Sequence, residues 1–265
     1  MLVSAINVSE GRSSAVIDAL ALAAAEDLLD VHTDAHHHRT VLTVVGEEAP
    51  QAVAAVAVDR IDLRHHSGVH PRLGSLDVVP FVPWGRTELD EAVAARDRFT
   101  RWLGTTMAVP AFSFGFGRPT LPEVRRQAFV ALHPDAGPGR PHPTAGATAV
   151  GARLPLVAYN LWLAQFDPAL ARSLARSLRS PRVRALGLVV GGHVQVSCNL
   201  LEPSAIGPAE IYDSVVAVTP VARTELVGLV PEAVLAATDR TRWAELDLAE
   251  DRTVESRVGR RAAGL

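Results

Sequence analysis

The chain has 265 residues, of which 48% are hydrophobic, 21% charged and 5% aromatic, so it falls among ordinary globular proteins. This length allows one large domain or two modest ones. A formal net charge of −3 gives no electrostatic reason to expect nucleic acid or an anionic membrane as a partner, so we expect a small-molecule ligand. The single cysteine, Cys198, excludes an internal disulfide framework and a cysteine-rich zinc site, and its apolar surroundings predict an inert core residue.

Neither a signal peptide nor a membrane span is expected. The opening residues MLVSAINVSEGR lack a basic region ahead of an apolar stretch. The longest apolar candidate, residues 16–31, is short and is interrupted by acidic residues from Asp18 to Asp30. We therefore expect a soluble, cytoplasmic protein.

Apolar periodicity in the first third of the chain predicts alternating strands and helices. The serines of SEGRSS can cap the first helix. The alanine- and valine-rich run 49–61 fits either element, and its length favours a helix. The predicted β-α-β-β-α-β order is strand 2–8, helix 14–26, strands 28–33 and 40–46, helix 49–61 and strand 76–84.

The middle of the chain predicts two helices around a strand, followed by a long loop. Thr87 and Asp90 are spaced as a variant capping box, and Gly104 can close the helix that they begin. A proline- and glycine-rich loop of this length is usually functional or disordered. The predicted elements are helix 87–104, strand 107–114, helix 121–132 and loop 133–152.

The last third repeats the first pattern and defines the predicted fold class, α+β. Each β-α-β-β-α-β unit matches the ferredoxin-like plan, in which helices cover one face of a mostly antiparallel sheet. We expect two such subdomains, 1–150 and 151–265, with their sheets back to back and a ligand cleft between them. The second is predicted as strand 154–163, helix 168–178, strands 183–190 and 193–201, helix 208–218 and strand 225–230, followed by a helical segment and a charged tail from residue 232.

Histidines concentrate in the stretch RHHSGVHPRLGSLDVVPF, residues 64–81, just before a strand expected to be buried. Histidine has an ordinary pKa near neutrality, so the stretch is a candidate catalytic edge, metal site or polar loop. On side-chain chemistry alone, His70 is interpreted as a loop residue bonded to a strand edge. His65 and His66 are interpreted as polar residues at a helix end.

A second histidine row, His36 to His38, is expected to form an exposed turn, because adjacent side chains in an extended loop point in different directions. Together with His32 the row could instead bind zinc, nickel or copper, which imidazole suits. A histidine-rich metal-binding protein or hydrolase is therefore an alternative.

Eight segments follow the order of a known family: INVSEGR, LLDVHTDAHHHRTVLTVVG, IDLRHHSGVHPRLGSLDVVPFVP, PDAGP, GATAVGAR, LVAYN, VQVSCNLL and ELVGLVP. They resemble the formiminotransferase domain of glutamate formimidoyltransferase, which is also the N-terminal part of formimidoyltransferase-cyclodeaminase. The resemblance runs from about Val3 to Pro231 and includes no cyclodeaminase half. It implies two α/β subdomains and transfer of a formimidoyl group from N-formimidoyl-L-glutamate to N5 of tetrahydrofolate, in histidine degradation. It also implies a cytoplasmic homodimer in which tetrahydrofolate is a co-substrate and no metal is needed.

The resemblance and side-chain chemistry together suggest roles for individual residues. By the family motif GVHPR, His70 is the general acid/base, which takes a proton from the folate amine and returns it to the leaving glutamate nitrogen. Arg39 and Arg72 can bind carboxylates through forked hydrogen bonds. The remaining candidates are Glu10, Asp34 and Asp77 for orienting the amidine, Gly137, Pro138 and Gly146 in the segment 137–146 for the flat folate ring, and Asn160 and Asn199 for its polar edges.

The same charged residues also have purely structural interpretations. Arg39 and Arg72 could pair with Asp34 and Asp77 as surface salt bridges of little energetic value. Asp77 could cap a turn, and Glu10 could cap the first helix.

Four positions depart from the family pattern. Val69 stands where glutamate commonly precedes the catalytic histidine, and His38 replaces an asparagine. Leu154 replaces a lysine found in many members, and His32 an acidic residue. These differences leave a second alternative, a repurposed homologue that binds folate or a small anion without catalysis.

Overall fold

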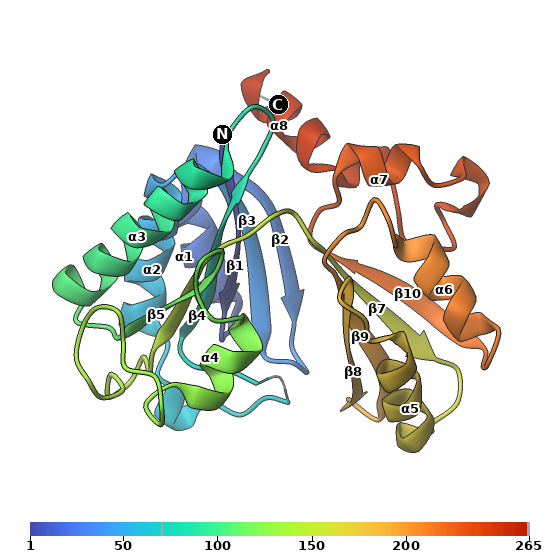
Figure 1. Ribbon diagram of the computed structural model, residues 1–265, viewed down its shortest axis with the longest axis horizontal. Coiled ribbons are helices and arrows are strands. Elements are labelled where there is room, and N and C mark those ends of the chain that lie inside the picture. Colours follow the sequence, from blue (N-terminus) through green and yellow to red (C-terminus); the bar gives the residue numbers. More distant parts are fainter. Residues whose placement is uncertain (70, 264–265) are drawn as a thin grey trace. The chain divides into compact units, whose positions relative to one another are not determined.

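The structure is a computed structural model that describes residues 1–69 and 71–263. Contacts divide the chain into two compact units, Met1–Leu154 and Pro155–Leu265 (Figure 1). Each unit has its own sheet and its own hydrophobic core. Among the described residues, no helix combines the length and apolar character that a bilayer span requires.

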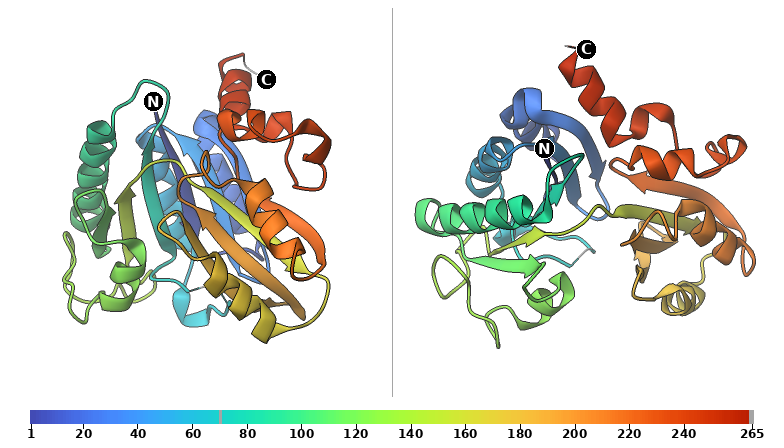
Figure 2. Two further views of the ribbon diagram at one scale, coloured as in Figure 1. Left: turned by 45° about the vertical axis from the view of Figure 1, so that its right-hand side comes forward. Right: turned by 45° about the horizontal axis from the view of Figure 1, so that its top comes forward.

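The first unit begins with the ferredoxin-like arrangement that the sequence predicts. Its first four strands pair antiparallel in the order β2-β3-β1-β4, and α1 and α2 lie together over one face of this sheet (Figure 2). The elements are β1 (Leu2–Val8), α1 (Ser14–Ala24), β2 (Leu28–Asp34), β3 (Arg39–Val45), α2 (Glu48–Arg60) and β4 (Leu76–Pro83), with short 3-10 helices η1 (Ala25–Asp27) and η2 (Leu63–His65).

Two parallel strands extend this sheet beyond the ferredoxin-like core. β6 pairs with both β4 and β5, which gives the six-stranded order β2-β3-β1-β4-β6-β5. Successive residues of β5 face opposite sides: Ala111 joins the core that α3 covers, whereas Phe112 packs with Val124 of α4. The added elements are α3 (Leu89–Thr106), β5 (Ala111–Gly115), α4 (Leu121–Gln127) and β6 (Thr148–Ala152).

The second unit is also ferredoxin-like, as predicted. Its four-stranded sheet has the order β10-β7-β9-β8, and every pairing is antiparallel. The elements are β7 (Val157–Leu163), α5 (Pro168–Leu178), β8 (Val183–Val190), β9 (His193–Leu200), α6 (Pro208–Val216), β10 (Val221–Val227), α7 (Glu232–Ala236) and α8 (Val254–Ala262), with 3-10 helices η3 (Arg240–Arg242) and η4 (Glu250–Arg252).

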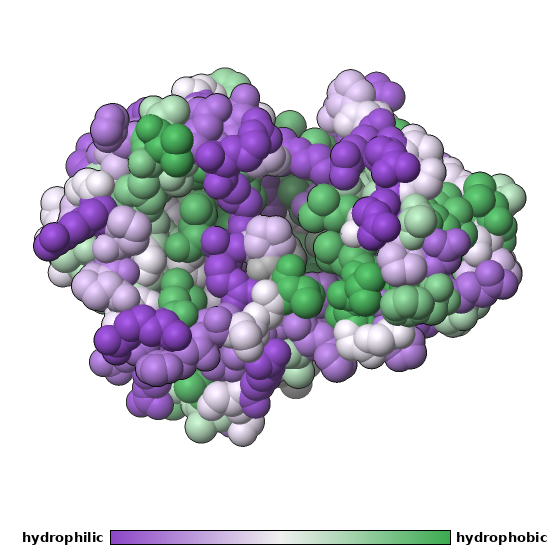
Figure 3. Space-filling view, turned by 90° about the horizontal axis from the view of Figure 1, so that it is seen from below, coloured by the Kyte–Doolittle hydropathy of each residue, from purple (hydrophilic) through white to green (hydrophobic). Residues whose placement is uncertain are grey.

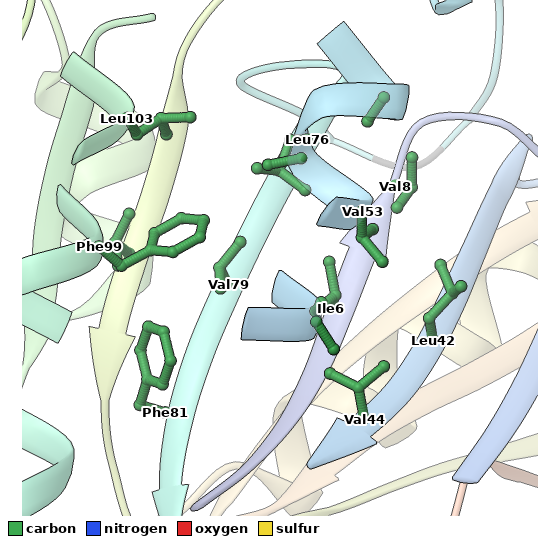
Figure 4. Packing of buried hydrophobic residues seen from close by; sticks show 14 of the residues in the cluster. Ile6, Val8, Leu42, Val44, Val53, Leu76, Val79, Phe81, Phe99 and Leu103 are labelled. Atoms are coloured by element: carbon green, nitrogen blue, oxygen red, sulfur yellow. The ribbon is translucent and has the colours of Figure 1, made fainter. Parts of the chain in front are cut away.

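Alternate strand residues build the core of the first unit, because side chains of a strand point to opposite faces in turn. Ile6 of β1 lies beside Leu42 and Val44 of β3, on the face that the helices cover (Figure 4). From α3, Phe99 contributes a ring whose centroid lies 5.7 Å from that of Phe81. Both rings are almost completely buried, so α3 is fixed to β4 by aromatic packing.

The second core contains the only cysteine of the chain. Cys198 of β9 lies in the cluster with Tyr159 and Leu161 of β7, and burial raises the pKa of its thiol to about 12. The expectation of an inert core cysteine is confirmed. The hydroxyl of Tyr159 donates to the carbonyl of Leu246 over 3.0 Å, which ties the segment before α8 to this core.

Apolar side chains are also exposed on the second unit. Leu186 and Val189 of the edge strand β8 are 44% and 42% exposed. Figure 3 shows hydrophobic residues gathered on the right-hand side of its view, where the C-terminal unit lies. The surface of this unit is therefore not uniformly polar.

The start and end of α3 differ from the prediction. Its capping box is formed by Glu88 and Glu91 rather than by Thr87 and Asp90, because Glu91 is the residue whose side chain reaches back to the N-cap amide, over 3.3 Å. Gly104 does not close the helix, which continues to Thr106. The glycine is instead a packing position, since a Cβ there would lie 2.4 Å from the amide nitrogen of Gly137.

The predicted helix 121–132 ends at Gln127. Phe129 adopts a left-handed conformation with φ of 61°, and the amides of residues 130–132 all donate to the carbonyl of Gln127 in a tight turn. A left-handed residue of this size cannot continue an α-helix.

The loop predicted over 133–152 contains the strand β6. Its sequence TAVGA has few strand-forming residues, so propensity does not indicate a strand. Packing requires a small residue there, because a Cβ at Gly151 would lie 2.2 Å from the ring of Phe114. The final strand lies over Val221–Val227 rather than 225–230, because β10 is an edge strand that tolerates polar residues such as Arg223.

We expect Phe99→Ala to lower the free energy of unfolding by about 3–5 kcal/mol, because it removes a buried ring and leaves a cavity. Urea denaturation followed by circular dichroism measures the change. The matched control is Leu22→Ala on α1, which is 80% exposed and should change stability by less than about 0.5 kcal/mol. Equal losses for the two variants would contradict the aromatic contact.

Candidate functional site

The turn between β2 and β3 is held by the carboxylate of Asp34. Its Oδ1 accepts from the amides of His36 and His37 over 2.7 and 2.8 Å, and its Oδ2 lies 2.9 Å from Nδ1 of His37. Burial would raise the pKa of Asp34, but the hydrogen bonds from His37 and His36 outweigh it and hold the pKa well below its ordinary value. Both oxygens of Asp34 are therefore engaged within the protein.

The histidine row forms a turn, as predicted, but the expectation that it is exposed is wrong for two of its members. His37 and His38 are only 7% and 9% exposed. His38 has a left-handed backbone with φ of 51°, which directs the chain into β3. His37 faces Asp34. His38 joins a cluster of polar side chains from other segments, formed by Glu10, His38, His66, Arg72, Asp77 and Arg125.

Glu10 organises the start of α1. Its Oε1 accepts from the amides of Gly11, Arg12 and Ser13 over 2.9, 2.7 and 2.9 Å. Partial burial would raise its pKa, but these bonds and the nearby His38 lower it overall. These amides precede α1, which begins at Ser14, so Glu10 holds the turn that leads into the helix rather than capping its first turn. The N-cap Ser13 also makes no capping bond with its side chain.

His38 is held as a neutral imidazole beside Glu10. Its Nδ1 accepts from the amide of Gly11 over 3.1 Å and lies 3.5 Å from Oε1 of Glu10. A nitrogen that accepts from an N–H cannot carry a proton of its own, so the hydrogen bond to Gly11 takes precedence over an ion pair with Glu10. Burial and the charges of Arg12 and Arg72 lower the pKa of His38 against the opposing effect of Glu10.

His66 stacks on His38. The ring centroids are 4.0 Å apart with an interplanar angle of 26°, and Nε2 of His66 lies 3.3 Å from the carbonyl oxygen of His38. The guanidinium of Arg72 contacts the His66 ring, with 2.7 Å between Nη1 and Nε2. Burial, followed by the charge of Arg72, lowers the pKa of His66 to about 4. His65 ends η2 and His66 follows it as the C-cap residue, as the sequence indicates. His66 also belongs to this cluster, which sequence reasoning missed.

Asp77 interacts electrostatically with Arg72 of the cluster and with Arg39. It is 2% exposed, so its interpretation as part of a surface salt bridge is wrong. Its Oδ1 accepts from the amide of Leu73 over 2.6 Å, which confirms the turn-capping interpretation, and its Oδ2 accepts from Nη2 of Arg125 over 2.6 Å. Burial lowers the pKa of Arg39 to about 10 against the attraction of Asp77, with further lowering by Arg125 and Arg72.

The predicted catalytic residue, His70, lies outside the described residues. The residues before it are Gly68, where a Cβ would lie 2.6 Å from the carbonyl oxygen of His37, and Val69, which is 51% exposed. The departure Leu154 is also exposed, at 61%, whereas His38 is part of the cluster.

The glycines of the proline- and glycine-rich loop make close backbone contacts. Gly137 has φ of 87° and lies against α3, with Pro138 exposed next to it. Gly146 has φ of 69°, and a Cβ there would lie 2.4 Å from the carbonyl oxygen of Leu73. The end of this loop therefore lies beside the backbone that precedes β4.

The two predicted asparagines belong to the second unit. Asn160 of β7 is 7% exposed and donates to Oε2 of Glu225 over 3.1 Å, an oxygen that also accepts from the indole of Trp162 over 2.9 Å. Asn199 of β9 is exposed. Asn160 is thus engaged with a neighbouring strand.

The histidine row does not form a metal site with its neighbours in the described part of the chain. No group of three or more histidine, cysteine, aspartate or glutamate side chains there is arranged to hold a metal ion. In particular, His37 is bonded to Asp34 and Nδ1 of His38 accepts from Gly11.

The same segments relate the chain to known proteins. A family model described as the formiminotransferase domain, N-terminal subdomain, matches residues 1–153, more than half of the chain. A glutamate formimidoyltransferase of Streptococcus pyogenes serotype M1 is 34% identical over 225 residues, which cover 74% of this chain and 75% of that protein. The chain belongs to the formiminotransferase family. The resemblance on which this membership was predicted is confirmed.

Other members of the formiminotransferase family differ in length. A glutamate formimidoyltransferase of Thermoplasma acidophilum is 30% identical over 86% of this chain and 88% of its own length. The formimidoyltransferase-cyclodeaminase of Sus scrofa is 34% identical over 85% of this chain but only 49% of its own length. The chain therefore spans about half the length of the formimidoyltransferase-cyclodeaminases it matches.

Two residues of the cluster in this formiminotransferase family member, His66 and Arg125, have no functional role predicted from the sequence. His66 could have been found only through its place in the family stretch, because nothing in its neighbours indicates a contact with His38. Arg125 lies in α4, 48 residues after Asp77, and no spacing rule connects the two.

We expect the stability of the wild type to fall as the pH decreases from about 6.5 to 5. His66 has a lower pKa in the folded chain, about 4 against 6.5, so the unfolded chain binds more protons over this interval. His66→Gln should remove about 1 kcal/mol of this pH dependence, a value reduced for the partial exposure of the ring. Urea denaturation at several pH values measures it, with His65→Gln as the exposed control. Identical pH slopes for the His66 and His65 variants would contradict a buried neutral imidazole.

Proposed function

We propose that the chain transfers a formimidoyl group from N-formimidoyl-L-glutamate to N5 of tetrahydrofolate, a step of histidine degradation. Membership of the formiminotransferase family supports the reaction, and relatives named glutamate formimidoyltransferase support this donor. The observation that carries the proposal is the cluster in the first unit. Segments that identify the family, containing Glu10, His38 and Arg72, meet there although they lie far apart in the sequence.

His70 is the proposed general acid/base. N5 of tetrahydrofolate attacks the amidine carbon, a tetrahedral intermediate forms, and the bond from that carbon to the glutamate nitrogen breaks. The imidazole accepts the proton that N5 loses and gives it to the departing glutamate nitrogen, so one residue serves both steps. This proton transfer needs no metal.

Cationic side chains around Asp77 support binding of an anionic donor. Arg39 and Arg72 are proposed to bind the carboxylates of glutamate and of the folate tail, for which a planar guanidinium suits two parallel hydrogen bonds. The pKa values of His38 and His66 are lowered, so both rings are neutral. They can form hydrogen bonds without neutralising the positive charge of the arginines. The groups that affect one another electrostatically include four arginines and two carboxylates: Arg12, Arg39, Arg72, Arg125, Glu10 and Asp77.

Glu10 is the carboxylate proposed to orient the cationic amidine. Its described hydrogen bonds to backbone amides all end on Oε1, so Oε2 is the oxygen assigned to the substrate. Asp34 and Asp77 are assigned instead to holding the segments on either side of the site, because their oxygens already bind protein groups. The residues proposed for tetrahydrofolate are Gly137, Pro138, Gly146, Asn160 and Asn199.

We expect His70→Ala to lower kcat by roughly 100- to 10,000-fold while folate binding is retained, because acid–base assistance of this kind contributes that much. Formimidoyl transfer is measured with the wild type and the variant, with folate affinity from fluorescence titration and His65→Ala as the control. Donors built on glutamate, glycine and aspartate are compared, and the glutamate donor should react fastest.

Two outcomes would contradict this proposal in different ways. Folate binding by the wild type without turnover of any donor would favour the repurposed homologue. Turnover by the wild type that is unchanged in His70→Ala would exclude the assigned acid/base but leave the reaction intact.

The chain is further proposed to act as a cytoplasmic homodimer, which is the assembly that the resemblance implies. Light scattering coupled to size-exclusion chromatography should give twice the mass of one chain across a tenfold range of protein concentration. A mass equal to one chain throughout that range would show that the homodimer is not the stable form.

A further inference from the structure

Arg125 connects α4 to the loop in front of β4. Its Nη2 donates to Oδ2 of Asp77 over 2.6 Å, and its Nη1 donates to the carbonyl oxygen of Pro71. One guanidinium thus bridges a buried carboxylate and a backbone carbonyl, a geometry that its planar fork permits and a lysine ammonium would not reproduce.

Asp77 fastens the other end of the same loop. Its Oδ1 accepts from the amide of Leu73 over 2.6 Å. The carbonyl of Pro71 and the amide of Leu73 are therefore held by two side chains that are ion-paired with each other. Arg72 lies between these two backbone groups, and its guanidinium contacts His66.

The helix that carries Arg125 is anchored independently of this contact. The side chain of Thr120 and the amide of Thr120 both bond to Oε2 of Glu123, each over 2.7 Å, in a capping box. Val124 is fully buried against β5 residues such as Phe112. From a helix that is already anchored, the guanidinium therefore extends to the loop before β4. The two contacts that it makes restrain the backbone of that loop rather than the helix.

We propose that Arg125 and Asp77 form a clamp that positions the segment 71–73, and with it the side chain of Arg72, for formimidoyl transfer. This role rests on the function proposed above. Neither residue needs to touch the substrate: the clamp fixes the peptide groups on either side of Arg72 and so the direction in which the chain presents that residue. Small misplacements of a reacting group reduce rates strongly, by up to about 100-fold for 1 Å.

The clamp is tested with Arg125→Met, Arg125→Lys and Asp77→Asn, and with Arg126→Met as the matched control. Arg126 is the next residue of α4 and is exposed. We expect kcat to fall about 10- to 100-fold in Arg125→Met and Asp77→Asn, with folate affinity within about twofold of the wild type. Arg125→Lys should recover part of kcat, because its ammonium can keep the pair with Asp77 but not both contacts.

A second measurement separates positioning from general stability and from the reaction itself. Hydrogen exchange of the peptide that spans residues 67–73 should be faster in Arg125→Met than in Arg126→Met, with unchanged exchange in the core strands. The effects of Arg125→Met and Asp77→Asn should be less than additive when the two are combined, because both break one unit.

Unchanged exchange in this peptide, or a kcat within twofold of the wild type in folded Arg125→Met, would overturn the clamp. If Arg125→Met does not fold, the same criteria apply to Asp77→Asn. A wild type that shows no transfer with any donor would overturn the proposed function instead, and the exchange measurement would still decide whether the clamp orders the loop.

Discussion

The buried carboxylate of Asp77 is the group on which the cluster in the first unit depends. An ionised carboxylate away from water is unfavourable unless its oxygens are hydrogen-bonded and its charge is matched. Here one oxygen binds a backbone amide and the other binds Arg125. Asp77 in turn allows Arg39, Arg72 and Arg125 to lie near one another, because its negative charge offsets their mutual repulsion.

Close backbone approach is the second requirement of this arrangement. A Cβ at Gly11 would lie 2.3 Å from the carbonyl oxygen of Asp34, and one at Gly74 would lie 2.1 Å from that of Ala147. These glycines let two pairs of segments distant in sequence meet with their main chains in contact. The polar side chains between them therefore have little freedom, which explains how a stacked pair of histidines and an arginine can share so small a space.

The strand and helix order of both units could be predicted from the sequence, because alternating residues such as Ile6 and Leu42 show their buried face directly. The histidine stretch was informative as a family signature rather than through its chemistry. Its contacts were not predictable: the burial of His38 depends on a left-handed turn, and its stacking on His66 joins residues 28 positions apart. The role of Arg125 was not predictable either, because its contact with Asp77 joins residues 48 positions apart. In the sequence, an arginine on a short helix cannot be distinguished from a solvent-exposed one. β6 was missed because its residues are chosen for small size rather than for strand propensity.

The position of β6 in the sheet also determines when the first unit can be completed. It is the last strand of that unit along the chain, yet it lies between β4 and β5, with Val78 opposite Ala149. A nascent chain emerges from its N-terminus, so β4 must present an open edge until residues 148–152 have left the ribosome. β5 and α4 cannot reach the sheet before that moment, and Arg125 cannot reach Asp77. The order of synthesis therefore makes the contact of Arg125 with Asp77 a late product of folding, and fragments that end before β6 would expose a strand edge suited to aggregation.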